Sequence, residues 1–356
     1  MSEDDPAGVG GASRFPRTPS PGPLRGKTAL RSPPRFARLA VQLAVSGAIL
    51  AFLLIRLDPA QVWDEITAAK TGYVVAALAI LFASTWAMAW RWQILLASKG
   101  IDEPLGWLTK LYFVGYAASQ VLPTSVGGDA VRILDHARRR PDARAEAAGA
   151  VLMERVLGVV GTVLLLLLGL VLAIGDERVR VIGPVGATLI AAAAALLLLL
   201  LFSRRVEDWL RRRVFPLGRR IGIERPLASG YRALHGYRDC RGALLAALAI
   251  TFATQLARTV SIWLCCAAVG IHESAGVFVV FAALLSLVMV VPFTLNGLGV
   301  REAFFVGYFG RFDVSNDTAL AAGLLFYAII LAESIPGAVI LLWHSFAGAV
   351  AHPRTE

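Results

Sequence analysis

Long apolar runs constrain this chain more than any other feature. A helix needs about 20 apolar residues to cross the hydrocarbon core of a bilayer, and eight runs approach or exceed that length. Hydrophobic residues make up 57% of the 356 residues and charged residues only 17%, against about a quarter in soluble domains. The composition excludes a water-soluble enzyme and predicts an all-α polytopic membrane protein. The runs are Leu39–Leu57, Tyr73–Ala97, Leu105–Leu122, Ala147–Ile174, Val181–Phe202, Ala243–Val269, Gly276–Val291 and Thr318–Trp343.

The net charge of +10 is concentrated in a few polar segments. Residues 1–38 contain seven Lys or Arg and residues 204–241 contain eleven Arg, so the positive-inside rule places both in the cytoplasm. The basic excess therefore sets orientation, and no nucleic-acid partner is expected. Residues 1–38, rich in Pro, Gly and Ser, are predicted to be a disordered tail, and residues 347–356 a short cytoplasmic tail.

Charge counting also predicts which runs fail to cross. If all eight crossed, the loop with Arg132, Arg138, Arg139, Arg140 and Arg144 would lie outside, against the positive-inside rule. The conflict disappears if the third and seventh runs dip into the membrane and return. We therefore expect about six full spans plus two re-entrant hairpins, with both termini in the cytoplasm.

An internal repeat supports the same topology. Residues 123–132 align without a gap with residues 292–301, and the Pro, the second Gly, the Val and the Arg coincide. The hairpins would enter from opposite sides, which predicts an inverted-topology repeat of the kind found in secondary transporters. The predicted transmembrane domain covers 39–346, with repeat one at about 73–174, the basic loop 204–241, and repeat two at about 243–343.

The predicted hairpin tips are rich in Pro and Gly. Pro123 and Pro292 should end the incoming helices, because proline disfavours helix in the residue before it. Short outgoing helices, near Gly128–Arg139 and Leu298–Gly310, would then begin inside the membrane, where their free amides suit an anion such as a lipid phosphate. Four glycines would permit the reversal and a close backbone approach: Gly127, Gly128, Gly297 and Gly299.

Arg132 and Arg301 are predicted to lie in the first turn of these outgoing helices and to bind that phosphate. The alternative is that both arginines snorkel to lipid headgroups at the surface. Asp129 is either a site residue or simply a helix N-cap. Glu302 is expected to cap its helix, to pair with an arginine, or to do both.

Charged residues inside the long runs are candidates for a site, because ionisable groups at membrane depth are costly and usually face a cavity or a partner. Arg91, Arg258 and Glu333 are the clearest cases. Glu154 and Arg155 form either part of the site or a surface ion pair. The alternative for the whole set is internal ion pairing that holds the bundle together.

Signatures of catalysis are absent from the sequence. We find no phosphate-binding loop, no His/Cys metal spacing and no nucleophile elbow, so no enzyme activity, cofactor or metal is expected. Cys265 and Cys266 lie in an apolar run and are predicted to be buried thiols.

Three segments resemble the flippase-like, or lysylphosphatidylglycerol synthase, transmembrane domain family: residues 123–132, residues 154–158 and the Asn-Gly-Leu-Gly-Val-Arg-Glu stretch at 296–302. The resemblance implies a multi-pass bacterial inner-membrane protein that moves a lipid between leaflets. Fused members carry a cytoplasmic lysyl-transferase domain, which is not expected here because the chain ends at Glu356. The resemblance carries over to these positions: Gly127, Gly128, Asp129, Arg132, Glu154, Arg155, Gly297, Gly299, Arg301 and Glu302.

The function that the sequence predicts is therefore a transporter or flippase for an anionic lipid, such as a modified phospholipid or a polyprenyl-phosphate-linked sugar. One alternative is a lipid-binding membrane subunit that serves a separate glycosyltransferase or lipid synthase. Another is a membrane-embedded transferase that uses Asp129 and the arginines.

Overall fold

The computed structural model describes residues 57–122, 127–180, 234–289 and 295–351, together with residues 43–44, 46–47, 49, 51–52 and 188. The predicted tail 1–38, both hairpin prolines, most of the first and fifth apolar runs and most of the basic loop 204–241 lie outside these residues. Every regular element in the described part is a helix. The protein is an all-helical, multi-pass membrane protein.

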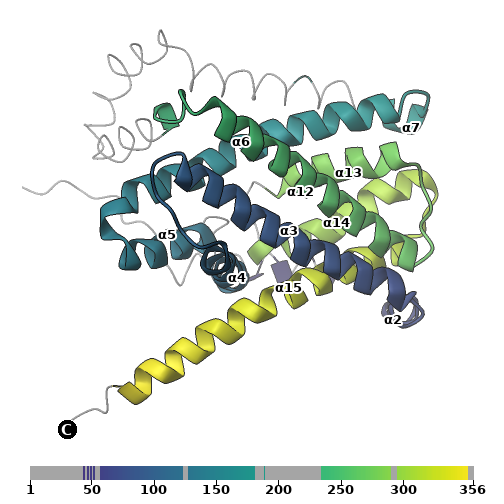
Figure 1. The fold of residues 1–356 in the computed structure, drawn as a ribbon. Helices are drawn as coiled ribbons and strands as arrows, with labels where there is room; N and C mark the ends of the chain where they lie inside the picture. Colours follow the sequence, from purple (N-terminus) through teal and green to yellow (C-terminus); the bar gives the residue numbers. More distant parts are fainter. Residues whose placement is uncertain are drawn as a thin grey trace, which may run out of the picture.

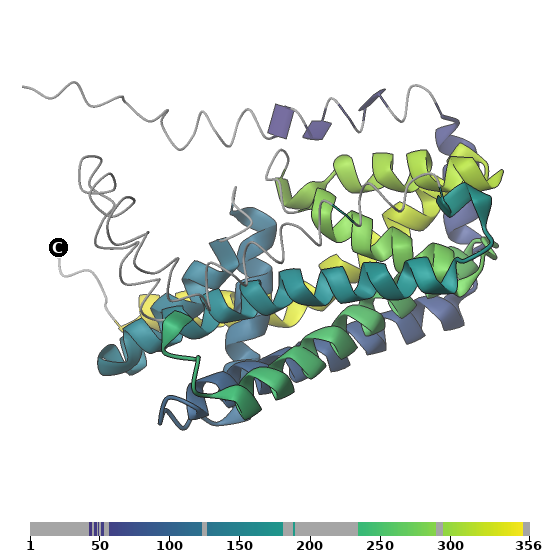
Figure 2. The same ribbon diagram turned by 90° about the horizontal axis from the view of Figure 1, so that it is seen from above.

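Four helices are long and apolar enough to cross a membrane, and they coincide with four of the predicted spans. They are α3 (Thr71–Ala97), α6 (Arg144–Leu172), α12 (Arg241–Ala268) and α15 (Asn316–Ala351). α3 packs along α12 and α6 packs beside them, so the three run side by side across the molecule (Figure 2). Many large side chains on these helices remain exposed, among them Trp86, Trp263 and Trp343, as expected for surfaces that face lipid.

Two pairs of shorter helices occupy opposite ends of this bundle (Figure 1). α4 (Leu105–Val121) packs against α5 (Gly127–Arg139), and α13 (Ala275–Val288) precedes α14 (Val300–Phe309). These pairs coincide with the predicted hairpins. The remaining elements are α2 (Pro59–Thr67), η1 (Pro141–Ala143), α7 (Glu177–Arg180), η3 (Leu295–Gly297) and η4 (Gly310–Phe312).

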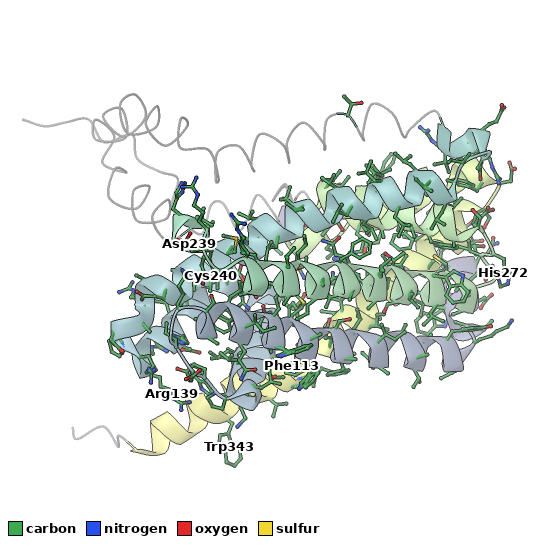
Figure 3. All side chains as sticks on the ribbon, turned by 45° about the horizontal axis from the view of Figure 1, so that its top comes forward. Phe113, Arg139, Asp239, Cys240, His272 and Trp343 are labelled. Carbon is green, nitrogen blue, oxygen red and sulfur yellow. The ribbon has the colours of Figure 1, made fainter. Side chains whose placement is uncertain are left out.

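The arginine-rich end of α5 and the described residues that precede α12 lie at one end of the bundle. Arg139 at the end of α5 and Asp239 at the end of the basic loop are both there, whereas His272, beyond the other end of α12, lies at the opposite end (Figure 3). The Lys99 ammonium donates to the Gly236 carbonyl and joins the end of α3 to this region. Arg139 and the described end of the basic loop, residues 234–241, are thus at the same end of the molecule.

Apolar packing divides into two clusters, one near each short-helix pair. Phe281 of α13 contacts Phe305 and Phe309 of α14, with ring centroids 4.6 and 4.9 Å apart. The other cluster is built around Trp92 and Met153. Cys265 and Cys266 are fully buried, as predicted. Polar side chains gather between the two clusters.

Candidate functional site

Two adjoining cavities lie inside the bundle. The larger, of about 460 Å³, is lined by residues of α3, α4, α5, α6 and α12. The smaller, of about 260 Å³, is lined mainly by α4, α12, α13, α15 and the tip that precedes α14. Their walls share six residues, Tyr116, Ser119, Arg258, Ser286, Met289 and Glu333. The larger is within the usual size range of small-molecule sites.

Glu154 of α6 is the centre of the larger cavity's polar network. Its Oε1 accepts a hydrogen bond from the Tyr112 hydroxyl at 2.5 Å and one from Arg91 Nε at 3.2 Å. Its Oε2 accepts from Arg132 Nη2 at 2.9 Å. Because Glu154 is only 4% exposed, the surface-ion-pair alternative for this residue is wrong. One carboxylate neutralises charge on two buried arginines from different helices.

Asp129 continues this network toward the surface. Its two oxygens accept from Arg132 Nη2 at 2.9 Å and from Arg155 Nη2 at 2.6 Å. Of the two alternatives for Asp129, the simple N-cap is therefore wrong, since Asp129 lies inside α5, in its first turn, and both of its oxygens are paired. The placement of Arg132 in the first turn is also wrong. Because α5 begins at Gly127, Arg132 lies in its second turn.

Aromatic rings enclose Arg132. Its guanidinium carbon lies 3.9 Å from the centre of the Tyr112 ring and 4.7 Å from that of Trp92, a geometry that stabilises a buried cation. The Trp92 ring also contacts the ring of His136, which lies near the arginine-rich end of α5. The His136 Nε2 atom is 3.6 Å from Glu103 Oε1. Burial lowers the pKa of His136, so this ring is neutral at neutral pH and adds no charge to the site.

The tip before α14 has the backbone conformation that the glycines predicted. Asn296, Gly297 and Gly299 have φ of 46°, 79° and 87°, values that favour glycine. Arg301 Nη2 donates to the Asn296 carbonyl at 2.8 Å. Glu302 Oε2 accepts from the Gly299 amide at 2.6 Å, so it caps α14 as expected.

The two helix pairs touch at their tips. The Asn296 side-chain amide donates to Gln120 Oε1, near the end of α4, at 2.5 Å. Arg132 and Arg301 nevertheless line different cavities. Each is buried within the bundle, 4% and 3% exposed, so the alternative that they snorkel to the surface is wrong.

Glu333 and Arg258 lie where the two cavities meet. Glu333 Oε1 accepts from the Thr85 hydroxyl at 2.5 Å. Arg258 lines both cavities and forms no hydrogen bond or ion pair with any residue that the structure describes. Its counterpart in the first half, Arg91, pairs with Glu154 and donates to Thr251 at 2.9 Å. The two halves therefore differ in how they neutralise their arginines.

Polar side chains of α3 and α12 also face this interior. Ser84 and Arg91 of α3 and Thr251, Gln255 and Arg258 of α12 all line the larger cavity. Gln255 Nε2 donates to the Gly158 carbonyl at 3.0 Å. Of the remaining predicted residues, Gly128, Asp129 and Arg155 also line the larger cavity. The other four do not line either cavity: Gly127 begins α5, Gly297 and Gly299 lie in the tip before α14, and Glu302 lies in α14.

Several residues of the site were not predicted from the sequence. Tyr112 and Tyr116 are one helical turn apart on α4 and both line the larger cavity, so their i, i+4 spacing beside a hairpin tip was an available signal. Thr85, Gln120 and Trp92 carried no comparable signal. Within the described ranges, no group of His, Cys, Asp or Glu is placed to hold a metal ion.

The fold and site together define a class: a polytopic helical membrane protein with a charged, arginine-rich interior. The sequence matches the family described as the lysylphosphatidylglycerol synthase TM region over residues 39–337, and the chain belongs to this family. Its role is therefore related to membrane lipids. A comparison with curated proteins finds no match.

Proposed function

We propose that this protein moves an anionic lipid between the leaflets of the bacterial inner membrane. The observation that carries the proposal is the charge of the cavity walls: among the described residues, five arginines, of which Arg155 is exposed, and three carboxylates line the two cavities, an excess of two positive charges. Charge at membrane depth is costly unless a partner or ligand compensates it. An anionic headgroup is the ligand that this excess favours, while its acyl chains stay in the bilayer.

The hairpin arginines would bind the headgroup phosphate. Arg132 Nη1 and Arg301 Nη1 are both buried and lack a hydrogen-bond partner among the described residues. Each guanidinium is thus held by one nitrogen and has a free donor on the other. α5 and α14 begin close to these arginines, and free amides at a helix start favour anions.

The same proposal interprets the helix pairs as re-entrant hairpins of an inverted repeat, with six full spans and both termini in the cytoplasm. α4–α5 and α13–α14 lie at opposite ends of the bundle (Figure 1). Such an arrangement gives access to a shared interior from either side in transporters with inverted repeats.

Cysteine labelling tests the proposed sidedness. Ala145, in the first turn of α6, and Ser274, the residue before α13, are exposed and follow Arg139 and His272, which lie at opposite ends of the bundle (Figure 3). Each is replaced by Cys in a background with Cys240→Ser. In intact cells, a membrane-impermeant maleimide should modify Ser274→Cys and leave Ala145→Cys unmodified until the cells are permeabilised. Modification of Ala145→Cys from outside would contradict the first hairpin.

A transport assay tests the function itself. The protein is reconstituted into liposomes with fluorescent phosphatidylglycerol, and a membrane-impermeant quencher reports lipid reaching the outer leaflet. We expect protein-dependent lipid movement that Arg301→Ala slows roughly ten- to hundred-fold, because a hydrogen bond to a charged partner contributes about 1.5–3 kcal/mol. Arg301→Lys should recover part of the rate, since lysine cannot bind phosphate bidentately.

The matched control is Arg311→Gln, an exposed arginine in the same half of the chain, which should transport at the wild-type rate. All variants must elute as a single folded species before they are compared. Lipid binding without movement would favour the accessory-subunit alternative. A chemically altered lipid, detected by mass spectrometry, would favour a membrane-embedded transferase.

A further inference from the structure

Arg258 differs from the other arginines of the interior. Arg91 and Arg132 pair with Glu154, Arg155 pairs with Asp129, and Arg301 donates to a backbone carbonyl. Arg258 has no such partner among the described residues. It lies well inside the 28-residue helix α12, where Glu333 is near enough to interact with its charge but no described acceptor binds its guanidinium donors. A residue in this situation is poised to receive an anion.

The position of Arg258 fits a shared binding point. It is the one arginine that lines both cavities within the described part of the chain. Two neighbouring hydroxyls are already used as donors, because Ser119 donates to the Gly115 carbonyl at 2.9 Å and Ser286 to the Ala282 carbonyl at 2.8 Å. The Tyr116 hydroxyl donates to the Met88 sulfur at 3.1 Å, a weak acceptor, so it can add a hydrogen bond to an anion but no charge. The charge of an anion at the junction is therefore compensated by the arginines.

The charge of the smaller cavity limits which anion fits. Its walls contain Arg258, Arg301 and Glu333, which leaves one positive charge in excess. A phosphodiester carries a single negative charge, whereas a phosphomonoester carries about 1.5–2 at neutral pH. A diester neutralises this cavity, and a monoester or a pyrophosphate would leave negative charge buried beside Glu333.

We propose that Arg258 is the primary ligand for a lipid phosphodiester at the junction of the two cavities, with the free Nη1 of Arg301 as a second donor. The larger cavity then holds the rest of the headgroup. This assignment rests on the proposed lipid-transport function and narrows it to lipids whose headgroup is joined through a diester. Glu333 acts as the selectivity residue, because its negative charge disfavours a second charge on the ligand.

Binding to the purified full-length protein tests the assignment. The probes are nanodiscs containing phosphatidylglycerol, a diester, or phosphatidic acid, a monoester, and the soluble diester glycerophosphoglycerol. Wild-type protein should prefer phosphatidylglycerol. Arg258→Gln should weaken that binding roughly ten- to hundred-fold, and Arg258→Lys should restore part of it. Arg311→Gln should bind like wild type.

A charge change at Glu333 supplies the second arm. Glu333→Gln keeps an acceptor for Thr85 and adds one net positive charge, so its preference should move toward phosphatidic acid. Arg258→Lys keeps the positive charge beside Glu333 and should unfold at the wild-type temperature, so its weaker binding separates lost binding from lost folding. Unchanged phosphatidylglycerol binding in Arg258→Gln, or unchanged preference in Glu333→Gln, would overturn the assignment. Equal affinity for the soluble diester would overturn its lipid part.

The outcome is separable from that of the transport assay. Arg258-dependent binding without lipid movement would refute transport and leave the binding site standing. Full transport by Arg258→Gln would refute the site and leave transport standing.

Discussion

Glu154→Ala is expected to destabilise the folded protein by about 3–5 kcal/mol, the range found when one partner of a buried ion pair is removed. The Glu154 carboxylate accepts from Arg91, Arg132 and Tyr112. Its loss removes a counter-charge from two buried guanidinium groups. Arg132 keeps its ion pair with Asp129, whereas Arg91 loses the ion pair that it forms with Glu154. Thermal unfolding of the purified protein in detergent measures the effect.

Two comparison variants make that result interpretable. Glu146→Ala removes an exposed carboxylate from the same helix and should change stability by less than about 1 kcal/mol. The double variant Arg91→Met with Glu154→Met replaces charge with apolar volume and should be more stable than Glu154→Ala, because it buries one fewer unpaired cation. Equal unfolding temperatures for Glu154→Ala and Glu146→Ala would show that the network does not hold the bundle.

Gly128→Ala is expected to destabilise the protein by at least about 1–3 kcal/mol, the usual cost of overpacking. A Cβ at this position would overlap the Gly115 carbonyl and the Ser119 hydroxyl of α4. The carbonyl belongs to helix backbone and cannot move alone, so α5 must shift. Asp129 and Arg132 would shift with it, and lipid transport should fall along with the unfolding temperature.

Gly307→Ala is the matched control on α14, the counterpart of α5. A Cβ there meets no atom within 4 Å, and alanine favours helix over glycine by about 1 kcal/mol. Its stability should equal or exceed that of wild type. If both alanine variants unfold alike, close approach of α4 and α5 is not what requires glycine at position 128.

The network around Glu154 also changes how the hairpin arginines are understood. The repeat suggests equivalent roles for Arg132 and Arg301, yet Arg132 pairs with two carboxylates and Arg301 pairs with a backbone carbonyl. Asp129 in the first half corresponds to Leu298 in the second, so the second tip has no carboxylate at that position. This asymmetry leaves Arg258 and Arg301 more available to a ligand than Arg91 and Arg132.

The sequence alone determined the class of fold and the main helices. Apolar runs of membrane length produced α3, α6, α12 and α15, because a chain segment in lipid must satisfy its backbone hydrogen bonds internally. The glycines at 297 and 299 marked a tip with positive φ. Charges inside apolar runs marked the site, since such charges need a partner or a cavity.

Only the tertiary structure decided which charges compensate one another. Arg91, Arg132 and Glu154 are far apart in the sequence, and spacing along each helix does not say which face meets which neighbour. Tyr112 and Trp92 entered the site through packing around the Arg132 guanidinium. Arg258 forms no hydrogen bond or ion pair with a described residue, and this depends on the distances between α12, α13 and α15. The sequence carries the residue types, but side-chain reach and helix packing set the pairing, because an ion pair forms only within a few ångströms.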